Sequence, residues 1–336
     1  MLWTVFGVAP AMSLLVLSET EIRSVLSPRA AIDSQRAAFA AVADGTVTAS
    51  GVTSSLDPED DSLTFAHTGA IRGRTGVTCK FGLQVPGNAG RGLPTVHAVV
   101  TVLRPGTGEP LACLNGATVT ALRTAAGIGA AAEVLARPDA SRLGLVGAGV
   151  QAREAARMIG AVRALSQIRV FARSARRSAE VAADLQAELG VPSIAADSAA
   201  QLAGESDIVV TATTSREPVV RGPWLRAGST VLTVGSYEPD RRELDLAATA
   251  RADATFADDP VKAASCCGPL VQARERGVPP VVGAIGKVIT GQTPGRAAAQ
   301  DVVLFHCAGL GVQDASLAWT VVELAIAAGA GRKVEF

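Results

Sequence analysis

The chain has 336 residues, of which 48% are hydrophobic, so it is long enough to bury a large core or to form two domains. Basic and acidic residues each number 31, so the formal net charge is zero, and aromatic residues make up 4%. This balance argues against a surface that binds nucleic acid or membranes. The five cysteines form no CxxC pair, so the sequence predicts neither a metal site nor a disulfide framework and favours a reducing, cytoplasmic location.

An apolar run, MLWTVFGVAPAMSLLVL, opens the chain. A secretory signal peptide begins with basic residues, but the first basic residue here is Arg23. A membrane-spanning helix needs about 20 apolar residues, and Pro10 interrupts this run. We therefore expect residues 1–13 to form a disordered extension, with Met12 as an alternative start, and residues 14–17 to form the first strand.

Helix-start signals follow at Ser18 and at Ser27-Pro28, and the second helix is expected to end at Ala43. Beyond it, stretches rich in β-branched residues alternate with turns, which is typical of antiparallel strands. These strands are predicted at 45–56, 62–68, 76–83, 95–103 and 110–114. An alanine-rich helix, 118–136, then ends before Pro138. The first part of the chain thus predicts an α+β domain.

The most informative stretch is RLGLVGAGVQAREAARMIG, residues 142–160. An apolar strand leads directly into Gly147-Ala-Gly149 and then into a helix that starts at Val150. In this pattern the first glycine permits a tight turn, the second lets a pyrophosphate approach the backbone, and the helix N-terminus offers N–H groups to phosphate. We predict a dinucleotide site that includes Gly147, Gly149, Val150 and Gln151. The alternative is an ordinary glycine turn.

Strands and helices alternate after this loop, as a doubly wound parallel sheet requires. Further strands are expected at 167–172, 194–196, 207–211, 230–234, 254–257 and 302–305, and helices at 175–189 and 315–328. The predicted fold class is α/β, with a Rossmann sheet and a discontinuous α+β domain to which the closing helix returns.

Ligands of such sheets bind beyond the carboxyl ends of the strands. NAD enzymes usually place an acidic residue after the second strand, but here Arg173, Ser174, Arg176 and Arg177 follow it. Because guanidinium groups bind phosphate and a carboxylate would repel it, we expect NADP(H) rather than NAD(H). The alternative is a solvated basic helix start. Later strand ends, at Thr213 and at Val234-Gly235, are expected to line the same cleft.

At this point the sequence resembles the ornithine cyclodeaminase/mu-crystallin family. The resemblance rests on four blocks in order: ALRTAA (121–126), GAGVQA (147–152), Val234-Gly-Ser with PDRREL (239–244), and Phe305 to Asp314. It implies that 14–120 and 314–336 bind substrate and build a homodimer, while 121–313 bind the cofactor. The family's activities share hydride transfer at the α-carbon of an amino or imino acid.

The resemblance also assigns site residues. Lys80 and Arg123 match the pair that holds the substrate carboxylate, a role that suits cationic donors; the alternatives are a solvated lysine and an interdomain ion pair. Thr95 and Thr124 are expected to contact the cofactor. Asp314 is either catalytic or the N-cap of the closing helix.

The chain departs from the family pattern at Tyr237, where cyclodeaminases carry an aspartate. A tyrosine, whose ordinary pKa is about 10, can donate a proton but is a poor base near neutrality. Many members also have an arginine in the stretch matching 45–51, and this chain has none. His67 falls near a cyclodeaminase glutamate and is a candidate proton donor, or a strand histidine with an ordinary structural role.

The sequence therefore predicts an NADP(H)-dependent oxidoreductase that acts on an imino or amino acid, with reduction favoured. Lys80 and Arg123 would hold the carboxylate, and Tyr237, His67 or water would supply the proton. Two alternatives stay open: a cyclodeaminase that releases ammonia from ornithine or lysine, and a non-catalytic, cofactor-binding sensor. The expected partners are a small amino or imino acid and a second copy of the chain, without nucleic acid or membrane.

Overall fold

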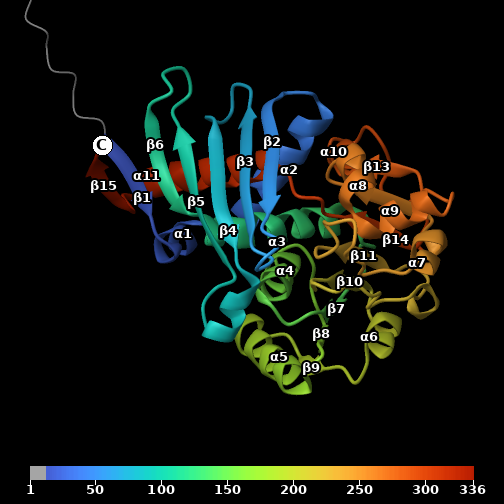
Figure 1. The fold of residues 1–336 in the computed structure, drawn as a ribbon. Helices are drawn as coiled ribbons and strands as arrows, with labels where there is room; N and C mark the ends of the chain where they lie inside the picture. The colour runs from blue at the N-terminus through green and yellow to red at the C-terminus, as the bar shows by residue number, and fades with distance from the viewer. Residues whose placement is uncertain (1–12) are drawn as a thin grey trace, which may run out of the picture.

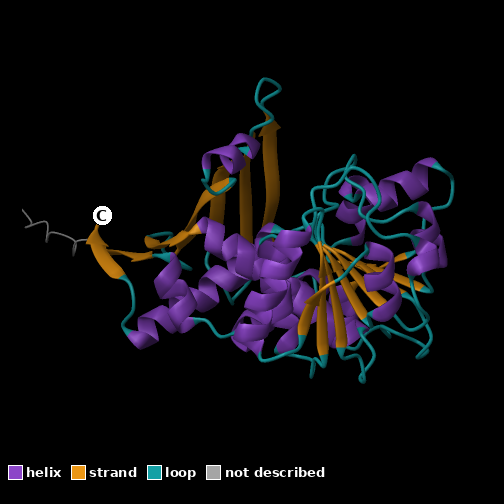
Figure 2. Ribbon diagram, turned by 90° about the horizontal axis from the view of Figure 1, so that it is seen from below, coloured by secondary structure: helices purple, strands orange, loops and turns teal. Residues whose placement is uncertain are grey.

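The computed structural model describes residues 13–336, so residues 1–12 of the expected N-terminal extension, with the alternative start at Met12, lie outside the described residues. Ser13, expected to belong to that extension, instead begins the first strand. The described chain builds two β-sheets, and Figure 1 shows them beside each other. In Figure 2 a layer of helices lies between the two sheets. This arrangement confirms the α/β fold class that the sequence predicts.

The first sheet has seven strands in the order β15-β1-β6-β5-β4-β3-β2. They are β1 Ser13–Leu17, β2 Val47–Leu56, β3 Leu63–Ile71, β4 Thr78–Gln84, β5 Val96–Leu103, β6 Pro110–Asn115 and β15 Arg332–Glu335. The strands β2 to β6 form an antiparallel meander, β1 joins β6 in parallel, and β15 pairs antiparallel with β1. The meander agrees with the predicted strands, with a short 3₁₀ helix, Pro86–Arg91, at a predicted turn.

Four helices cover one face of this sheet: α1 Glu19–Val25, α2 Pro28–Ala43, α3 Gly116–Leu135 and α11 Gly311–Ala328. The expected starts are confirmed, since Ser18 caps α1 in a capping box and Ser27 caps α2 with Pro28 in the first helical position. Alanine and glycine residues dominate α3, which is buried over most of its length. Their small size lets α3 pack closely against α2, α4 and α11.

The second sheet has eight parallel strands in the order β13-β12-β14-β11-β10-β7-β8-β9. They are β7 Arg142–Val146, β8 Gln167–Phe171, β9 Ser193–Ala195, β10 Ile208–Thr211, β11 Thr230–Thr233, β12 Ala254–Ala257, β13 Val282–Ala284 and β14 Val303–His306. The chain runs outward from β7 to β9 and then crosses back to β10 on the other side of β7. This reversal is the switch point at which doubly wound sheets bind ligands.

The helices of this part are α4 Val150–Gly160, α5 Ala175–Leu189, α6 Ala199–Glu205, α7 Leu246–Arg251, α8 Pro260–Cys266, α9 Gly268–Glu275 and α10 Ile285–Ile289. A second 3₁₀ helix spans Gly222–Trp224. The sequence predicts α4 and α5 with these bounds but none of α6 to α10. Those helices have five to eight residues, too few turns to display a helical period.

Two glycines bring the N-terminus of α11 against β3. A Cβ on Gly69 would lie 2.2 Å from the carbonyl oxygen of Gly311, and one on Gly311 would lie 1.9 Å from that of Thr68. Only glycine fits at both positions, so the first turn of α11 touches the sheet. Asp314 lies in that turn and is therefore held directly over the strands.

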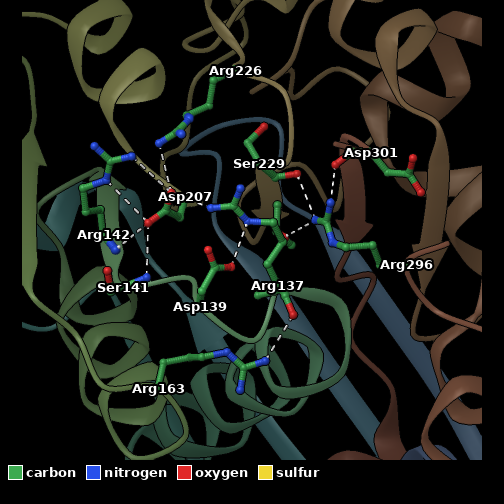
Figure 3. A network of polar contacts seen from close by, with 12 residues as sticks. Arg137, Asp139, Ser141, Arg142, Arg163, Asp207, Arg226, Ser229, Arg296 and Asp301 are labelled. Carbon is green, nitrogen blue, oxygen red and sulfur yellow. Dashed lines mark hydrogen bonds and ion pairs between the residues drawn. The ribbon is translucent and has the colours of Figure 1, made fainter. Parts of the chain in front are cut away.

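Asp207 joins the end of α3 to the amino ends of the parallel strands (Figure 3). Its buried carboxylate accepts from Arg137 Nη2 at 3.1 Å, from Arg226 Nη1 at 3.0 Å, and from the main-chain N–H groups of Ser141 and Arg142 at 3.1 and 3.0 Å. The carboxylate thus accepts charge-assisted hydrogen bonds from the end of α3, from the start of β7 and from Arg226, and these bonds hold the three segments together.

Arg296 extends this network to β11. It donates to the carbonyl oxygen of Leu135 at 3.0 Å and to Thr230 Oγ1 at 2.8 Å (Figure 3 shows the arginine). The last turn of α3 is therefore fixed at the starts of the parallel strands. A helix rises about 1.5 Å per residue and a strand about 3.3 Å, so the turns of α3 that precede Leu135 cover the length of these short strands. Arg123, near the middle of α3, therefore lies at the carboxyl ends of the same strands.

The first sheet takes its strands from 13–115 and 332–335, and the second from 142–306. The expected domain boundaries, between 120 and 121 and between 313 and 314, fall inside α3 and α11, and we keep the division as a proposal. None of the helices within residues 13–336 is long and apolar enough to cross a membrane.

Candidate active site

Asp314 is the centre of a cluster that joins α11 to β3, β4 and α3. Its Oδ1 accepts from Lys80 Nζ at 3.0 Å and from Arg123 Nε at 3.1 Å, and its Oδ2 lies 3.2 Å from Nδ1 of His67. Lys80 and Asp314 are each 1% exposed. The structure thus brings together four of the residues predicted to be catalytic. The alternative that Asp314 is an N-cap is wrong, because α11 begins at Gly311 with Leu310 in the capping position.

Strand register explains how these side chains meet. His67 and Lys80 are direct partners on β3 and β4, so they project side by side from one face of the sheet. Along β4 the burial alternates, with Lys80 inward and Phe81 and Leu83 exposed on the other face. The alternative of a solvated lysine at position 80 is therefore wrong.

Burial and neighbouring charges shift the pKa values of three side chains in the cluster. Burial lowers the pKa of Lys80 to about 8, with Arg123 acting in the same direction and Asp314 opposing. Burial alone would raise the pKa of Asp314, but Lys80, Arg123 and His67 outweigh it and hold that pKa below its ordinary value. Burial also lowers the pKa of His67. With a neutral His67, the two cations and one carboxylate leave one net positive charge.

His67 is fixed in one tautomer by this arrangement. A carboxylate only accepts hydrogen bonds, so a neutral His67 donates through Nδ1 to Asp314. Its Nε2 is then left as an acceptor. The position therefore suits a hydrogen-bond acceptor better than the proton donor considered from the sequence.

The loop between β14 and α11 is fixed by two residues that the sequence analysis missed, Asp258 and Lys262. Asp258 accepts from the N–H groups of Ala308 and Gly309 at 3.0 and 2.7 Å, and Lys262 Nζ donates to the carbonyl oxygen of Gly309. Gly309 lies against Arg123, since an added Cβ would be 3.3 Å from Nη1. Asp258 directly follows the predicted strand β12, and this strand-end position is the signal that could have identified it.

Tyr237 follows β11 in a loop that Glu243 holds in place. The fully buried Glu243 accepts from the N–H groups of Thr213 and Gly235 at 2.6 and 2.7 Å, which ties the ends of β10 and β11 together. Burial raises the pKa of Tyr237, while Arg241 and Arg123 oppose the shift. Because β11 and β14 are parallel neighbours, Tyr237 follows β11 at the same edge of the sheet from which the chain leaves β14 toward Gly309 and Asp314.

The glycine loop has the geometry expected for a dinucleotide. Gly147 has φ of 121°, and a Cβ there would lie 2.4 Å from the carbonyl oxygen of Ala212, so only glycine fits the turn. Gly149 caps α4 without a side-chain hydrogen bond and has open space on its Cβ side. The first N–H groups of α4, beginning at Val150, are thus available to phosphate. The side-chain oxygen of Gln151 is buried without a hydrogen-bond partner in the described part of the chain.

Beside this loop is a hollow of about 520 Å³ lined by Ala148, Ala172, Arg173, Ser174 and Arg177. Ser174 caps α5, and Arg177 pairs with Glu180 at 3.4 Å. Arg173 has no ion-pair partner within residues 13–336. The residues present therefore fit a dinucleotide, because the N-terminus of α4 offers N–H donors and the hollow beside it contains the guanidinium of Arg173.

The other residues expected to contact the cofactor are more scattered. Thr213, Val234 and Gly235 lie at the carboxyl ends of β10 and β11, and Thr124 is buried on α3 next to Arg123. Thr95 is exposed just before β5, and none of the hydrogen bonds of residues 13–336 joins it to the glycine loop.

Comparison with known proteins gives a consistent family. The family model described as ornithine cyclodeaminase/mu-crystallin matches residues 12–329. The iminosuccinate reductase of Paracoccus denitrificans is 30% identical, with 96% of this chain and all of that protein covered. Thermococcus litoralis Δ1-pyrroline-2-carboxylate reductase, in complex with NADH and L-proline, is 29% identical with a TM-score of 0.91, covering 96% of this chain and all of that one.

An archaeal alanine dehydrogenase dimer with bound NAD is 28% identical with a TM-score of 0.88, covering 97% of this chain and all of that one. These relatives are reductases and a dehydrogenase, in agreement with the sequence-based expectation. The chain belongs to the ornithine cyclodeaminase/mu-crystallin family.

Proposed function

We propose that the protein is a nicotinamide-dependent oxidoreductase that transfers hydride to the α-carbon of an imino acid. The observation that carries the proposal is the buried cluster of Lys80, Arg123 and Asp314, which lies beside the carboxyl ends of a dinucleotide-binding sheet. Relatives named as imine reductases support the same chemistry.

A substrate carboxylate supplies the one negative charge that the cluster lacks. Asp314 orients the Lys80 ammonium and the Arg123 Nε–H, and none of the hydrogen bonds of the described residues uses Nη2 of Arg123. A planar guanidinium fixes the plane of a carboxylate, and through it the position of the adjoining α-carbon. Burial of these groups excludes water and strengthens the attraction.

A bound nicotinamide supplies the hydride in this reaction. In this proposal Lys80 and Arg123 hold the carboxylate, and Tyr237, which follows β11, supplies the proton to the imine nitrogen. Because burial raises the pKa of Tyr237, the phenol stays protonated near neutrality, so it carries a proton to donate and is not available as a base, which favours reduction of an imine. Cyclodeamination would require a base at this position, so the cyclodeaminase alternative is the weaker one.

The activity test is a panel of imines and amines with NADPH. We expect NADPH oxidation with cyclic imines that carry a carboxylate, or with a 2-oxo acid plus ammonia or methylamine. A cyclodeaminase would instead form a cyclic product from ornithine or lysine without consuming added NADPH. Tight NADPH binding without turnover of any substrate would support the non-catalytic sensor.

We propose NADP(H) as the cofactor because the guanidinium of Arg173 is unpaired in the described chain and lines the hollow after β8. Removing a charged hydrogen bond costs about 1.5–3 kcal/mol, so Arg173→Ala should raise the KM for NADPH roughly 10- to 100-fold. The KM for NADH should stay the same.

Arg176→Ala is the matched control, because Arg176 is 84% exposed and pairs with Glu180. It should change neither KM. Equal effects of Arg173→Ala on both cofactors would contradict the assignment to NADP(H).

We further propose a homodimer and a cytoplasmic location. The dimer is supported by the archaeal alanine dehydrogenase dimer and by an exposed apolar face on the first sheet, which includes Phe81 and Leu83. The cytoplasmic location is supported by the free thiols of all five cysteines.

A further inference from the structure

Arg241 makes two contacts with Tyr237, one with the phenol oxygen and one with the ring. Its Nη1 donates to Oη of Tyr237 at 3.0 Å, and its guanidinium carbon lies 4.7 Å from the centre of the ring. Arg241 Nε is in turn 2.9 Å from the carboxylate of Glu238. The arginine side chain is only 13% exposed, so this arrangement is largely shielded from solvent.

The chemistry of a guanidinium determines what the phenol can do. An arginine only donates hydrogen bonds, so it occupies a lone pair of the phenol oxygen. The O–H of Tyr237 must then point away from Arg241 and act as a donor. The same positive charge stabilises the phenolate that remains after the proton leaves.

We propose that Arg241 is a positioning residue that commits Tyr237 to donating the proton in imine reduction, with Glu238 holding the guanidinium in place. This inference rests on the proposed function. The imine carbon gains a hydride from the reduced nicotinamide, and the imine nitrogen gains the proton of Tyr237. The C=N bond becomes a CH–NH single bond, and the phenolate regains a proton from water.

Other groups near the cluster are less suited to this step. His67 uses its Nδ1–H on Asp314, and burial lowers its pKa, so it carries no spare proton near neutrality. The charged groups that act on Tyr237 are Arg241 and Glu238 from its own loop and Arg123 from α3. Of these, Arg241 alone contacts the phenol oxygen among the hydrogen bonds of residues 13–336.

A direct test is available because Tyr237 is the only tyrosine in the chain. The ultraviolet absorbance of its phenolate can therefore be titrated without interference from another tyrosine. An opposite charge within about 4–6 Å lowers a pKa by roughly 1–3 units, so Arg241→Gln should move the midpoint upward by about one unit or more. Arg241→Lys should restore part of the shift.

Arg216→Gln is the matched control, because Arg216 is 75% exposed and pairs with Asp240 in the same region. It should leave the midpoint unchanged. An Arg241→Gln midpoint equal to that of the unmodified protein would overturn the proposal.

Kinetics give the second readout. Arg241→Gln should lower kcat for imine reduction roughly 10- to 100-fold, a part of the typical effect of general acid catalysis, and leave the KM for the imine unchanged. Tyr237→Phe should lower kcat at least as far. Adding Arg241→Gln to Tyr237→Phe should cause no further loss, because Arg241 acts through the phenol. A further loss in the double variant would refute that role.

The two readouts separate this inference from the proposed function. If the unmodified protein reduces no imine, the proposed function fails. The absorbance titration still decides whether Arg241 controls the phenol.

Discussion

Lys80 decides whether the candidate site can attract an anion. Its pKa of about 8 means that it is protonated below that pH and neutral above it, so the charge opposite a substrate carboxylate is lost as the pH rises through about 8. Groups of the free enzyme control kcat/KM. We therefore expect kcat/KM for the imino acid to fall about tenfold per pH unit above pH 8, measured as initial rates of NADPH oxidation.

Two lysine variants check the origin of this decrease. Lys80→Met should lower kcat/KM at every pH and remove the alkaline decrease. Lys287→Met is the control, since Lys287 is exposed on α10, and should retain it. An unchanged alkaline decrease in Lys80→Met would show that another group titrates.

At the scale of residues, the family resemblance was sufficient to nominate Lys80, Arg123, His67 and Asp314 as site candidates, because each lies in a recognisable block or strand. It could not show that Asp314 binds the other three, since that depends on the close approach of Gly69 and Gly311. Arg241 and Lys262 were missed for a similar reason. Their partners are a phenol and a carbonyl oxygen whose positions only the folded loops define.

At the scale of elements, the loop from β14 to α11 lies against the guanidinium of Arg123 at Gly309. Gly309 has φ of 75°, a left-handed conformation, and a Cβ added there would lie 3.3 Å from Nη1 of Arg123. Gly309→Ala should destabilise the protein by about 1–2 kcal/mol from the backbone alone. It should also displace Arg123, the proposed ligand of the substrate carboxylate, and raise the KM for the imino acid roughly tenfold or more.

Gly277 provides a matched control for the backbone effect. It has φ of 74° in the turn after α9, and nothing lies within 4 Å of an added Cβ. Gly277→Ala should therefore lose similar stability in thermal unfolding while leaving the KM unchanged. If the two variants show the same KM, the contact between Gly309 and Arg123 does not control substrate binding.

The elements also show which sequence signals are sufficient to predict the bounds of a helix or strand. The long α5 and the glycine-flanked α4 match their predicted bounds, because capping residues and several helical turns mark them. The strand β15 could not be predicted from RKVE, which is exposed and has no apolar alternation. It forms because its backbone pairs with β1 at the other end of the chain, a contact that local propensity does not encode.

At the scale of the whole molecule, the α-helices of residues 13–336 that pack on the first sheet cover one of its faces. On the other face Phe81 and Leu83 are 52% and 39% exposed, and strand register places Ala66 and Val99 beside Phe81. A groove of about 690 Å³ runs along these strands, and it is lined by residues that include Phe81, Leu83, Ala66 and Val99. The groove also has polar lining residues, among them Thr53, Thr64 and His97. An apolar patch bordered by polar residues is typical of an interaction surface, and we propose that this face forms the homodimer interface.

A charge at Phe81 tests this assignment. In a two-fold symmetric interface each substitution occurs twice, so a loss of about 2 kcal/mol per copy would weaken dimerisation roughly 10³-fold. Phe81→Asp should therefore be monomeric in sedimentation velocity at concentrations at which the unmodified protein is dimeric. Val281→Asp, at a position that is 93% exposed just before β13, should remain dimeric. The glycine loop lies on the other sheet, so Phe81→Asp should still bind NADPH, and this binding would show that the variant is folded. If the folded variant remains dimeric, the interface lies elsewhere.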